Sequence, residues 1–392
     1  QVWNLSGSLS VDTILAQYGS NPIFEYMQPD YIVTKGTISP QATFPNDPGF
    51  NQLWGLHNTG QSGGTADADI DAPEAWDIQT GNPNLVIGVI DTGVDYNHQD
   101  LVGNIWTNPG EIAGDGIDND GNGYIDDIRG WDFAYNDNNP SDVDGHGTHV
   151  SGTIAGKGNN GVGVTGVAWN AKIMPLKFHD ETGSGSTSNA IKAINYATAK
   201  GVKLTNNSWG GGGFSQALYD AINAAGQAGA LFIAAAGNDS LNIDVSPHYP
   251  SSYNLANIIS VAATNRNDQL VTFDNTGAGS GSNYGLTSVD LGAPGSDIYS
   301  TTPNNNYATY SGTSMASPHV AGAAALLWSQ NPTWTAQQVK NTLMNTGDSI
   351  AALAGKTVSG KRLNVFNALG GTATPVVTVV ANDAVAGEPA NN

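Results

Sequence analysis

The chain of 392 residues contains no cysteine. It can therefore form neither a disulfide bond nor a thiolate metal site. Secretion remains open, since an oxidising compartment permits disulfides without requiring them. Basic residues are also scarce, with 13 lysines and arginines against 34 aspartates and glutamates and a formal net charge of -21. This balance argues against binding to nucleic acid or to an anionic membrane, and it favours solubility and cation sites.

Long apolar runs are missing as well. No stretch reaches the roughly twenty apolar residues that a membrane-spanning helix requires, and the longest candidate, residues 320–328, directly follows Pro318 and His319. The chain is long enough for one large α/β core with appendages. It begins at Gln1 without a methionine or signal peptide, so we expect a processed chain or a part of a longer one.

Three polar residues lie at predicted strand ends or helix starts, where functional sites of α/β proteins are commonly found. The apolar run 85–90 predicts a buried strand that delivers Asp91 at its carboxyl end, and such strand ends carry the sites of open parallel sheets. His146 opens a helix with several small residues, and Ser314 opens a long helix of small apolar residues. A serine becomes a nucleophile when an imidazole takes its proton and a carboxylate orients that imidazole. The structural alternative for Ser314 is an ordinary helix N-cap.

Asn238 and His149 also each have a functional interpretation and a structural one. Asn238 follows a predicted buried strand that starts at Ala230, where its carboxamide can donate a hydrogen bond to an oxyanion, although asparagine is also a common turn residue. His149 lies three positions after His146, but with neither an HExxH motif nor a cysteine in the chain a zinc site is a weak interpretation.

The segments VIDTGVD, GHGTHVSG and GTSMASPHVAG, in this order, resemble the three signature segments of the subtilisin-like serine peptidases. The resemblance covers nearly all of residues 44–369. It implies a three-layer α/β fold with a mainly parallel sheet and helices on both faces. It also implies that Asp91 orients His146, that His146 is the general base and later the acid, and that Ser314 is the nucleophile. Asn238 would form the oxyanion hole, which Thr313 and the backbone N–H of Ser314 would complete.

The resemblance also indicates the substrate-binding segments. Two stretches match the strands that flank a bound peptide, and further positions line the first specificity pocket: Gly183, Ser184, Gly185, Ser208, Trp209, Gly210, Ala236, Gly237, His248 and Thr313. Glycines let a substrate backbone approach closely, but they also make ordinary flexible loops. The peptide bond before Pro250 is a candidate for the cis form.

His248 departs from the small residue often found at the floor of that pocket. Its side chain would either shorten the pocket or turn away from it. We expect a large apolar or aromatic side chain before the scissile bond, within a broad specificity.

Calcium is the predicted cofactor, at two or more sites. The acidic loop 115–127 spaces oxygen ligands at alternate positions, as the first part of an EF-hand loop does, although it lacks the terminal glutamate. So many carboxylates without a cation would repel one another, and the alternative is a solvated acidic turn. The candidate ligands are Asp115, Asp118, Asp120, Asn122, the carbonyl of Tyr124, Asp126 and Asp127.

The resemblance implies a second calcium site. Its side-chain ligands would be Asp100 and Asn160, and either Asp47 or Gln52 would complete it. Backbone carbonyls would come from Gly158, Val162 and Val164.

The predicted organisation has three parts. Residues 1–43 contain a stretch, 21–33, that resembles the end of a subtilisin-type propeptide, which would be a partner of the enzyme. Residues 44–369 form the catalytic domain. Residues 370–392 shift to a Gly/Thr/Pro linker with a short β-prone run at 376–380, as if a β module began there.

The combined interpretation is a monomeric, secreted or extracellular serine endopeptidase, with attachment to the cell surface through a missing C-terminal region as a variant. Its partners would be protein or peptide substrates. Two alternatives remain: a calcium-dependent binding module on an inactive scaffold, and an acyl transferase or ligase that shares the acyl-enzyme. A kexin-type processing enzyme is a nearer alternative, but the substrate strands lack the acidic pocket that it would need.

Overall fold

The computed structural model describes residues 11–22, 42–272 and 280–371. The chain divides into two units, one made of Gln1–Ser39 and Thr374–Asn392, the other of Pro40–Ala373. In the first unit the described residues form one helix, α1 (Val11–Tyr18). The predicted propeptide strand, apart from its first two residues, and the β-prone run at 376–380 lie outside the described residues.

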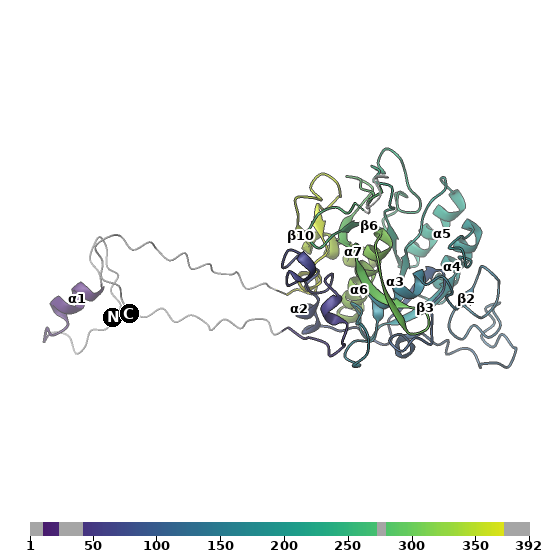
Figure 1. Ribbon diagram of the computed structural model, residues 1–392, viewed down its shortest axis with the longest axis horizontal. Coiled ribbons are helices and arrows are strands. Elements are labelled where there is room, and N and C mark those ends of the chain that lie inside the picture. Colours follow the sequence, from purple (N-terminus) through teal and green to yellow (C-terminus); the bar gives the residue numbers. More distant parts are fainter. Residues whose placement is uncertain (1–10, 23–41, 273–279, 372–392) are drawn as a thin grey trace. The chain divides into compact units, whose positions relative to one another are not determined.

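The larger unit is built on a nine-stranded sheet with the order β10-β11-β7-β6-β5-β4-β1-β3-β2. Figure 1 labels β2, β3, β6 and β10 of this sheet, with helices beside it. All neighbouring strands are parallel except the short pair β10 and β11. The strands are β1 (Val86–Asp91), β2 (Trp131–Asp132), β3 (Lys172–Lys177), β4 (Leu204–Asn207), β5 (Leu231–Ala235), β6 (Ile258–Thr264), β7 (Leu291–Pro294), β10 (Asp348–Ser349) and β11 (Lys361–Arg362). A separate antiparallel hairpin pairs β8 (Ile298–Thr302) with β9 (Asn306–Tyr310).

The central strands are buried on both faces because helices cover both. Every residue of β5 and β6 is buried, which is the pattern expected of parallel strands between two helical layers. The helices α3 (His146–Ala155) and α6 (Thr313–Gln330) share one core cluster with the sheet, and α4 (Thr187–Ala199) and α5 (Gln216–Gln227) share the other. The predicted three-layer α/β architecture is confirmed.

The remaining helices are short or lie at the ends of the unit. They are α2 (Ala72–Trp76), α7 (Ala336–Thr346), α8 (Val365–Ala368) and the 3-10 turns Phe50–Gln52, Gln61–Gly63 and Val102–Asn104. Helix α7 begins at a capping box, in which the Thr335 side chain accepts from the backbone of Gln338 and the Gln338 side chain accepts from the backbone of Thr335.

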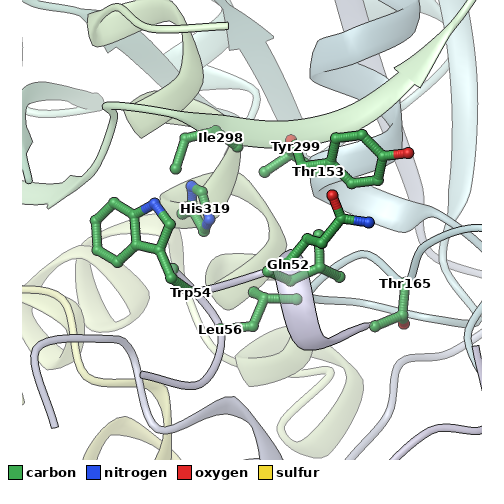
Figure 2. A pocket seen from close by; sticks show the side chains of 10 residues that line it. Gln52, Trp54, Leu56, Thr153, Thr165, Ile298, Tyr299 and His319 are labelled. Atoms are coloured by element: carbon green, nitrogen blue, oxygen red, sulfur yellow. The ribbon is translucent and has the colours of Figure 1, made fainter. Parts of the chain in front are cut away.

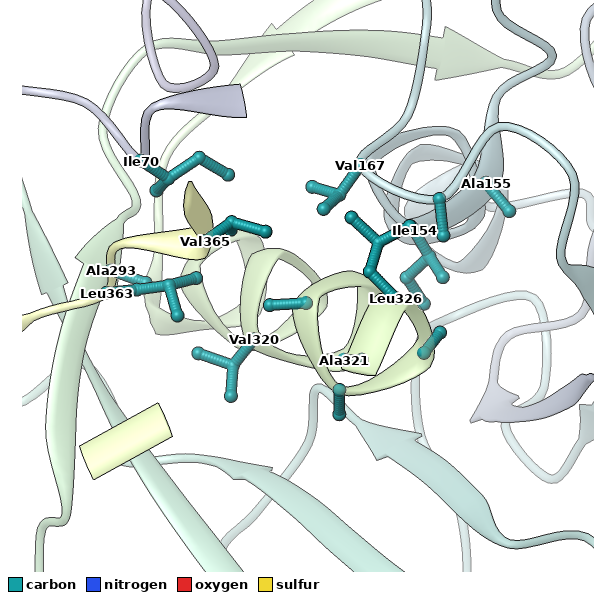
Figure 3. Packing of buried hydrophobic residues seen from close by; sticks show 14 of the residues in the cluster. Ile70, Ile154, Ala155, Val167, Ala293, Val320, Ala321, Leu326, Leu363 and Val365 are labelled. Carbon is teal, nitrogen blue, oxygen red and sulfur yellow. The ribbon is translucent and has the colours of Figure 1, made fainter. Parts of the chain in front are cut away.

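Helix α6 is the centre of the larger core. Every residue from Met315 to Trp328 is buried. Figure 3 shows Val320, Ala321 and Leu326 of this helix among side chains of other elements, including Ile154 of α3. Small residues let the helix approach its neighbours closely. Within the described ranges, no helix combines the length and the apolar character needed to cross a membrane.

Candidate active site

The carboxyl ends of four parallel strands meet at one edge of the sheet. Asp91 ends β1, Ser208 follows β4, Asn238 follows β5, and His179 comes two residues after β3. His146 and Ser314 begin α3 and α6 at the same edge, and both line one cavity together with Ser208, Asn238 and His179. The fold therefore brings together side chains that lie far apart in the sequence.

Asp91 and His146 form a direct pair. The Asp91 carboxylate is fully buried, and its Oδ1 accepts hydrogen bonds from His146 Nδ1 at 2.8 Å and from the Thr92 backbone N–H at 2.7 Å. Because a carboxylate can only accept here, His146 Nδ1 carries the hydrogen and Nε2 keeps its lone pair. Burial alone would lower the pKa of His146, but the charge of Asp91 and this hydrogen bond outweigh it and raise the pKa above 6.5. The imidazole is thus oriented as a proton acceptor.

Two features hold this pair in place. Gly147 allows α3 to approach the end of β1, because a Cβ atom at this position would lie 2.1 Å from the Gly93 carbonyl oxygen. The buried Asp142 carboxylate accepts from Thr92 Oγ1, from the Gly145 N–H, and from both the N–H and the hydroxyl of Thr148. One side chain therefore ties the strand end that carries Asp91 to the helix start that carries His146.

The hydroxyl of Ser314 is engaged with Ser208 in this structure. Ser314 Oγ donates to the Ser208 carbonyl at 3.0 Å, and Ser208 Oγ donates to the Ser314 carbonyl at 2.8 Å. The second bond explains how α6 accommodates Pro318. Proline lacks the N–H that would bond the carbonyl four residues earlier, and the Ser208 hydroxyl takes its place. Ser314 must turn its hydroxyl away from Ser208 to reach His146, as catalytic hydrogen bonds often form only with substrate.

The carboxamide of Asn238 has a fixed orientation. Its Oδ1 accepts from the Thr313 backbone N–H and from Thr313 Oγ1, both at 2.9 Å. The atom that faces an N–H must be the oxygen, so the Nδ2 amino group is the part left to donate. Asn238 is exposed and lines the cavity with Ser314, whose N–H belongs to the first turn of α6 and has no intrahelical acceptor. The two donors are suited to an oxyanion.

Comparison with known proteins agrees with this arrangement. The sequence model of the subtilase family matches residues 82–371. Thermitase from Thermoactinomyces vulgaris is 38% identical over 300 residues, which cover 76% of this chain and 93% of the relative. The chain belongs to the subtilase family.

Further matches agree. The cell wall-associated protease of Bacillus subtilis (strain 168) is 38% identical over 316 residues, which cover 80% of this chain but only 31% of that relative. The crystal structure of a cold-adapted subtilisin-like serine proteinase superposes with a TM-score of 0.61 at 32% identity, covering 80% of this chain and 98% of the other. This subtilase is a serine endopeptidase.

The subtilase cavity contains most of the substrate-binding residues named from the sequence. Its lining includes Gly183, Ser208, Trp209, Gly210, Gly237, His248 and Thr313. Ser184, Gly185 and Ala236 are not part of the lining: Ala236 is fully buried, and Gly185 packs beneath the ring of His179. The Tyr249–Pro250 bond is cis.

Sequence reasoning missed five lining residues, which are Thr92, Asp144, His179, Ala235 and Asp239. His179 carried a usable signal, because it follows a parallel strand that is paired in register with the one ending at Asp91.

The acidic loop 115–127 gathers only some of its predicted calcium ligands. The carboxylates of Asp120 and Asp127 cluster with that of Glu111, their oxygens lying within 4.8 Å of one another. Asn122 joins them by donating to Asp127 at 2.8 Å. Lys200, at the end of α4, pairs with Asp120 and lies 3.3 Å from Asp127.

The other predicted ligands in this loop have different partners. Asp115, Asp118 and Asp126 accept hydrogen bonds from backbone N–H groups of the surrounding turns. The ring of Tyr124 packs against that of Tyr196, with centroids 5.1 Å apart, and this contact does not involve the Tyr124 carbonyl that the sequence predicts as a ligand. Two of the predicted ligands, Asp120 and Asp127, thus join an acidic cluster, and its third member, Glu111, lies before the predicted segment.

Asp100, predicted at the second calcium site, is fully buried and contacts two of the residues predicted with it. Its Oδ1 accepts from Asn160 Nδ2 at 2.9 Å and its Oδ2 from the Val164 N–H at 2.8 Å. Burial raises the pKa of Asp100, and within the described ranges this carboxylate forms no ion pair with lysine or arginine. Gly158 and Val162 lie on the same loop. A buried carboxylate without a cationic partner suits a metal ion.

Asp47 and Gln52, the two candidates to complete the second calcium site, lie in different places. Asp47 accepts from the backbone N–H groups of Asn159 and Asn160, at 2.6 and 3.1 Å, and so contacts the loop of Asp100. Gln52 instead lines a separate small pocket with Trp54, Tyr299 and His319 (Figure 2). Asp47 is therefore the candidate ligand.

Proposed function

We propose that this subtilase is a secreted, calcium-stabilised endopeptidase in which Asp91, His146, Ser314 and Asn238 are the catalytic residues. The observation that carries the proposal is the Asp91–His146 hydrogen bond at a cavity that His146, Ser314 and Asn238 line together. An inactive binding module would not need all four groups at one strand edge.

The reaction begins when Ser314 turns from the Ser208 carbonyl toward His146. Its Oγ attacks the peptide carbonyl carbon while His146 Nε2 takes the hydroxyl proton, and Asp91 stabilises the imidazolium that forms. Asn238 Nδ2 and the Ser314 N–H donate to the developing oxyanion. The C–N bond then breaks as His146 gives its proton to the leaving amine. Water, activated by the same histidine, hydrolyses the acyl-enzyme and restores Ser314.

Calcium is proposed at the two acidic clusters. Glu111, Asp120 and Asp127 supply hard oxygen ligands to one, and Asp47, Asp100 and Asn160 to the other. The bound ion would neutralise carboxylates that repel one another. In the first cluster, Lys200 already offsets part of that charge. Both clusters are separate from the catalytic cavity, so calcium would act on stability rather than on chemistry.

Secretion and monomeric action on proteins or peptides are proposed together. The name of the Bacillus subtilis relative places that protein at the cell wall, and the acidic, cysteine-free composition suits a soluble extracellular enzyme. The enzyme's own propeptide is a further proposed partner. The residue selected before the scissile bond depends on His248, and a large apolar side chain there requires the ring of His248 to leave its observed position.

A labelling experiment tests the catalytic assignment. The purified protein should react stoichiometrically with a phosphonofluoridate at Ser314 and lose all hydrolysis of casein and peptides. Ser314→Ala should take no label and show no turnover while keeping the wild-type circular dichroism. Retained turnover in Ser314→Ala would refute the assignment. Addition of an amine separates the ligase alternative, because a ligase forms joined product faster than it hydrolyses.

A further inference from the structure

The ring of His248 fills the slit between two segments of the catalytic cavity. A Cβ atom on Gly210, after β4, would lie 2.1 Å from His248 Cε1, and one on Gly237, after β5, would lie 2.9 Å from His248 Nε2. Both glycines line the cavity that contains Ser314. The imidazole thus stands where these two backbone walls would otherwise enclose a long side chain of the substrate.

Hydrogen bonds hold the ring and fix its tautomer. The buried Ser251 donates its only hydroxyl hydrogen to the His248 carbonyl at 2.7 Å. Ser251 Oγ also lies 3.0 Å from His248 Nδ1. Because that hydrogen is already used, Nδ1 must carry a hydrogen and donate it to Ser251. Nε2 then keeps its lone pair at the glycine walls, as an acceptor with no partner in the described part of the chain. Burial lowers the pKa of His248, which favours this neutral form.

The charges around the cavity also disfavour an acidic side chain of the substrate. Asp144 and Asp239 are exposed and line it, and its described lining contains neither lysine nor arginine. A short acidic side chain of a substrate would meet the lone pair of His248 and the nearby negative charge of Asp239, with no lysine or arginine in the described lining to pair with. A short side chain that donates a hydrogen bond would meet an acceptor. A long aromatic side chain would overlap the imidazole.

We propose that His248 makes the first specificity subsite short and hydrogen-bond accepting, so that the enzyme prefers asparagine before the scissile bond over leucine, aspartate and phenylalanine. This inference rests on the proposed function, because it needs Ser314 as the nucleophile. It selects the alternative in which the histidine shortens the pocket, and it replaces the large apolar preference expected from the sequence.

The test uses four peptides that differ only in the residue before the scissile bond, which is asparagine, aspartate, leucine or phenylalanine. Asparagine and aspartate have the same shape, and leucine has the same number of non-hydrogen atoms with the same branching, so the three differ mainly in hydrogen bonding and charge. At pH 8, kcat/KM for asparagine should exceed that for leucine by roughly three- to tenfold, the value of one hydrogen bond. Aspartate should be cleaved more slowly than leucine, and phenylalanine slowest.

Two variants separate size from hydrogen bonding. His248→Gly should open the slit, so that phenylalanine becomes the best of the four substrates. His248→Phe keeps a ring in the slit but has no acceptor, so discrimination against phenylalanine should remain while asparagine loses its advantage over leucine. Each preparation is titrated with the phosphonofluoridate, so that rates refer to active sites.

The possible outcomes are distinguishable. A wild-type protein that takes no label and cleaves none of the peptides overturns the proposed function, and this inference with it. A labelled, active enzyme that prefers leucine or phenylalanine overturns the inference alone. So does a His248→Gly variant with the wild-type order of preference. If the variants fail to fold, the wild-type order of asparagine, leucine and aspartate still decides the question.

Discussion

A buried histidine outside the catalytic pair should make this enzyme sensitive to acid. His149 lies in α3, and its Nε2–H donates to the carbonyls of Ile298 at 2.9 Å and Ala308 at 3.2 Å. Its ring stacks on Tyr310, with centroids 4.4 Å apart. His149 Nδ1 is buried and has no hydrogen-bond partner among the residues that the structure describes. Burial lowers the pKa of His149 from 6.5 to about 3, because a protonated imidazole at this position would lose its contact with water.

The direction in which stability changes with pH follows from proton uptake by His149. Below pH 6.5 the unfolded chain binds a proton at this imidazole, whereas the folded protein does not until the pH approaches 3. The contribution of His149 to stability is therefore complete above pH 6.5 and is lost progressively as the pH falls. From pH 7 to pH 4 the protonation difference extends over roughly 2.5 pH units. At about 1.4 kcal/mol per unit, the free energy of unfolding decreases by about 3 kcal/mol.

Urea unfolding at pH 7 and pH 4 measures this loss. The experiment uses Ser314→Ala as the background to prevent self-digestion, and compares it with the same protein carrying His149→Gln, which keeps an N–H donor but does not titrate. The decrease in unfolding free energy between the two pH values should be about 3 kcal/mol smaller with His149→Gln. His57→Gln, at a half-exposed position, controls for removing a histidine. An equal decrease with and without His149 would refute the reasoning.

Three further predictions concern the catalytic and calcium sites. Asn238→Leu should lower kcat by about 10²–10³-fold with little change in KM, because it removes one oxyanion donor; an unchanged kcat in steady-state assays would exclude that role. The kcat/KM of the wild type should rise with pH through a midpoint above 6.5, since His146 must be neutral to take the proton and Asp91 raises its pKa; a midpoint below 6.5 would contradict this. Removal of calcium with a chelator should lower the Tm of Ser314→Ala by roughly 4 °C for each site held about a hundredfold above its Kd. Asp100→Asn and Asp120→Asn then show which cluster is responsible, and an unchanged Tm in chelator would refute both sites.

The parts of the fold that follow from local pattern could be predicted from the sequence. The apolar run before Asp91 forms β1, because a continuous apolar run is enough to indicate a buried strand. Helix α3 begins at His146, because the residues next to a helix start determine its first turn. The predicted long helix of small residues forms as α6, even across Pro318. That proline is tolerated through a hydroxyl from Ser208, which no local rule could supply.

The remainder depends on contacts between distant segments. Lys200 meets Asp120 across 80 positions of sequence, and Glu111 joins the acidic cluster from outside the motif that marked it. The sequence does not determine the ring position of His248, because that position depends on the space between Gly210 and Gly237. Composition and spacing identify which groups are present, whereas the packing of the finished fold decides where each side chain points.

The placement of Ser314 on the buried helix α6 has a consequence for the timing of activity. This helix contacts β4, β5, β6 and β7 as well as α3, so it reaches its position only when most of the sheet exists to receive it. During synthesis, Asp91 and His146 emerge long before the hydroxyl that they serve. A partly translated chain that ends before α6 (Thr313–Gln330) would lack the proposed nucleophile, and so would have no means of cutting itself or its neighbours until that helix is in place.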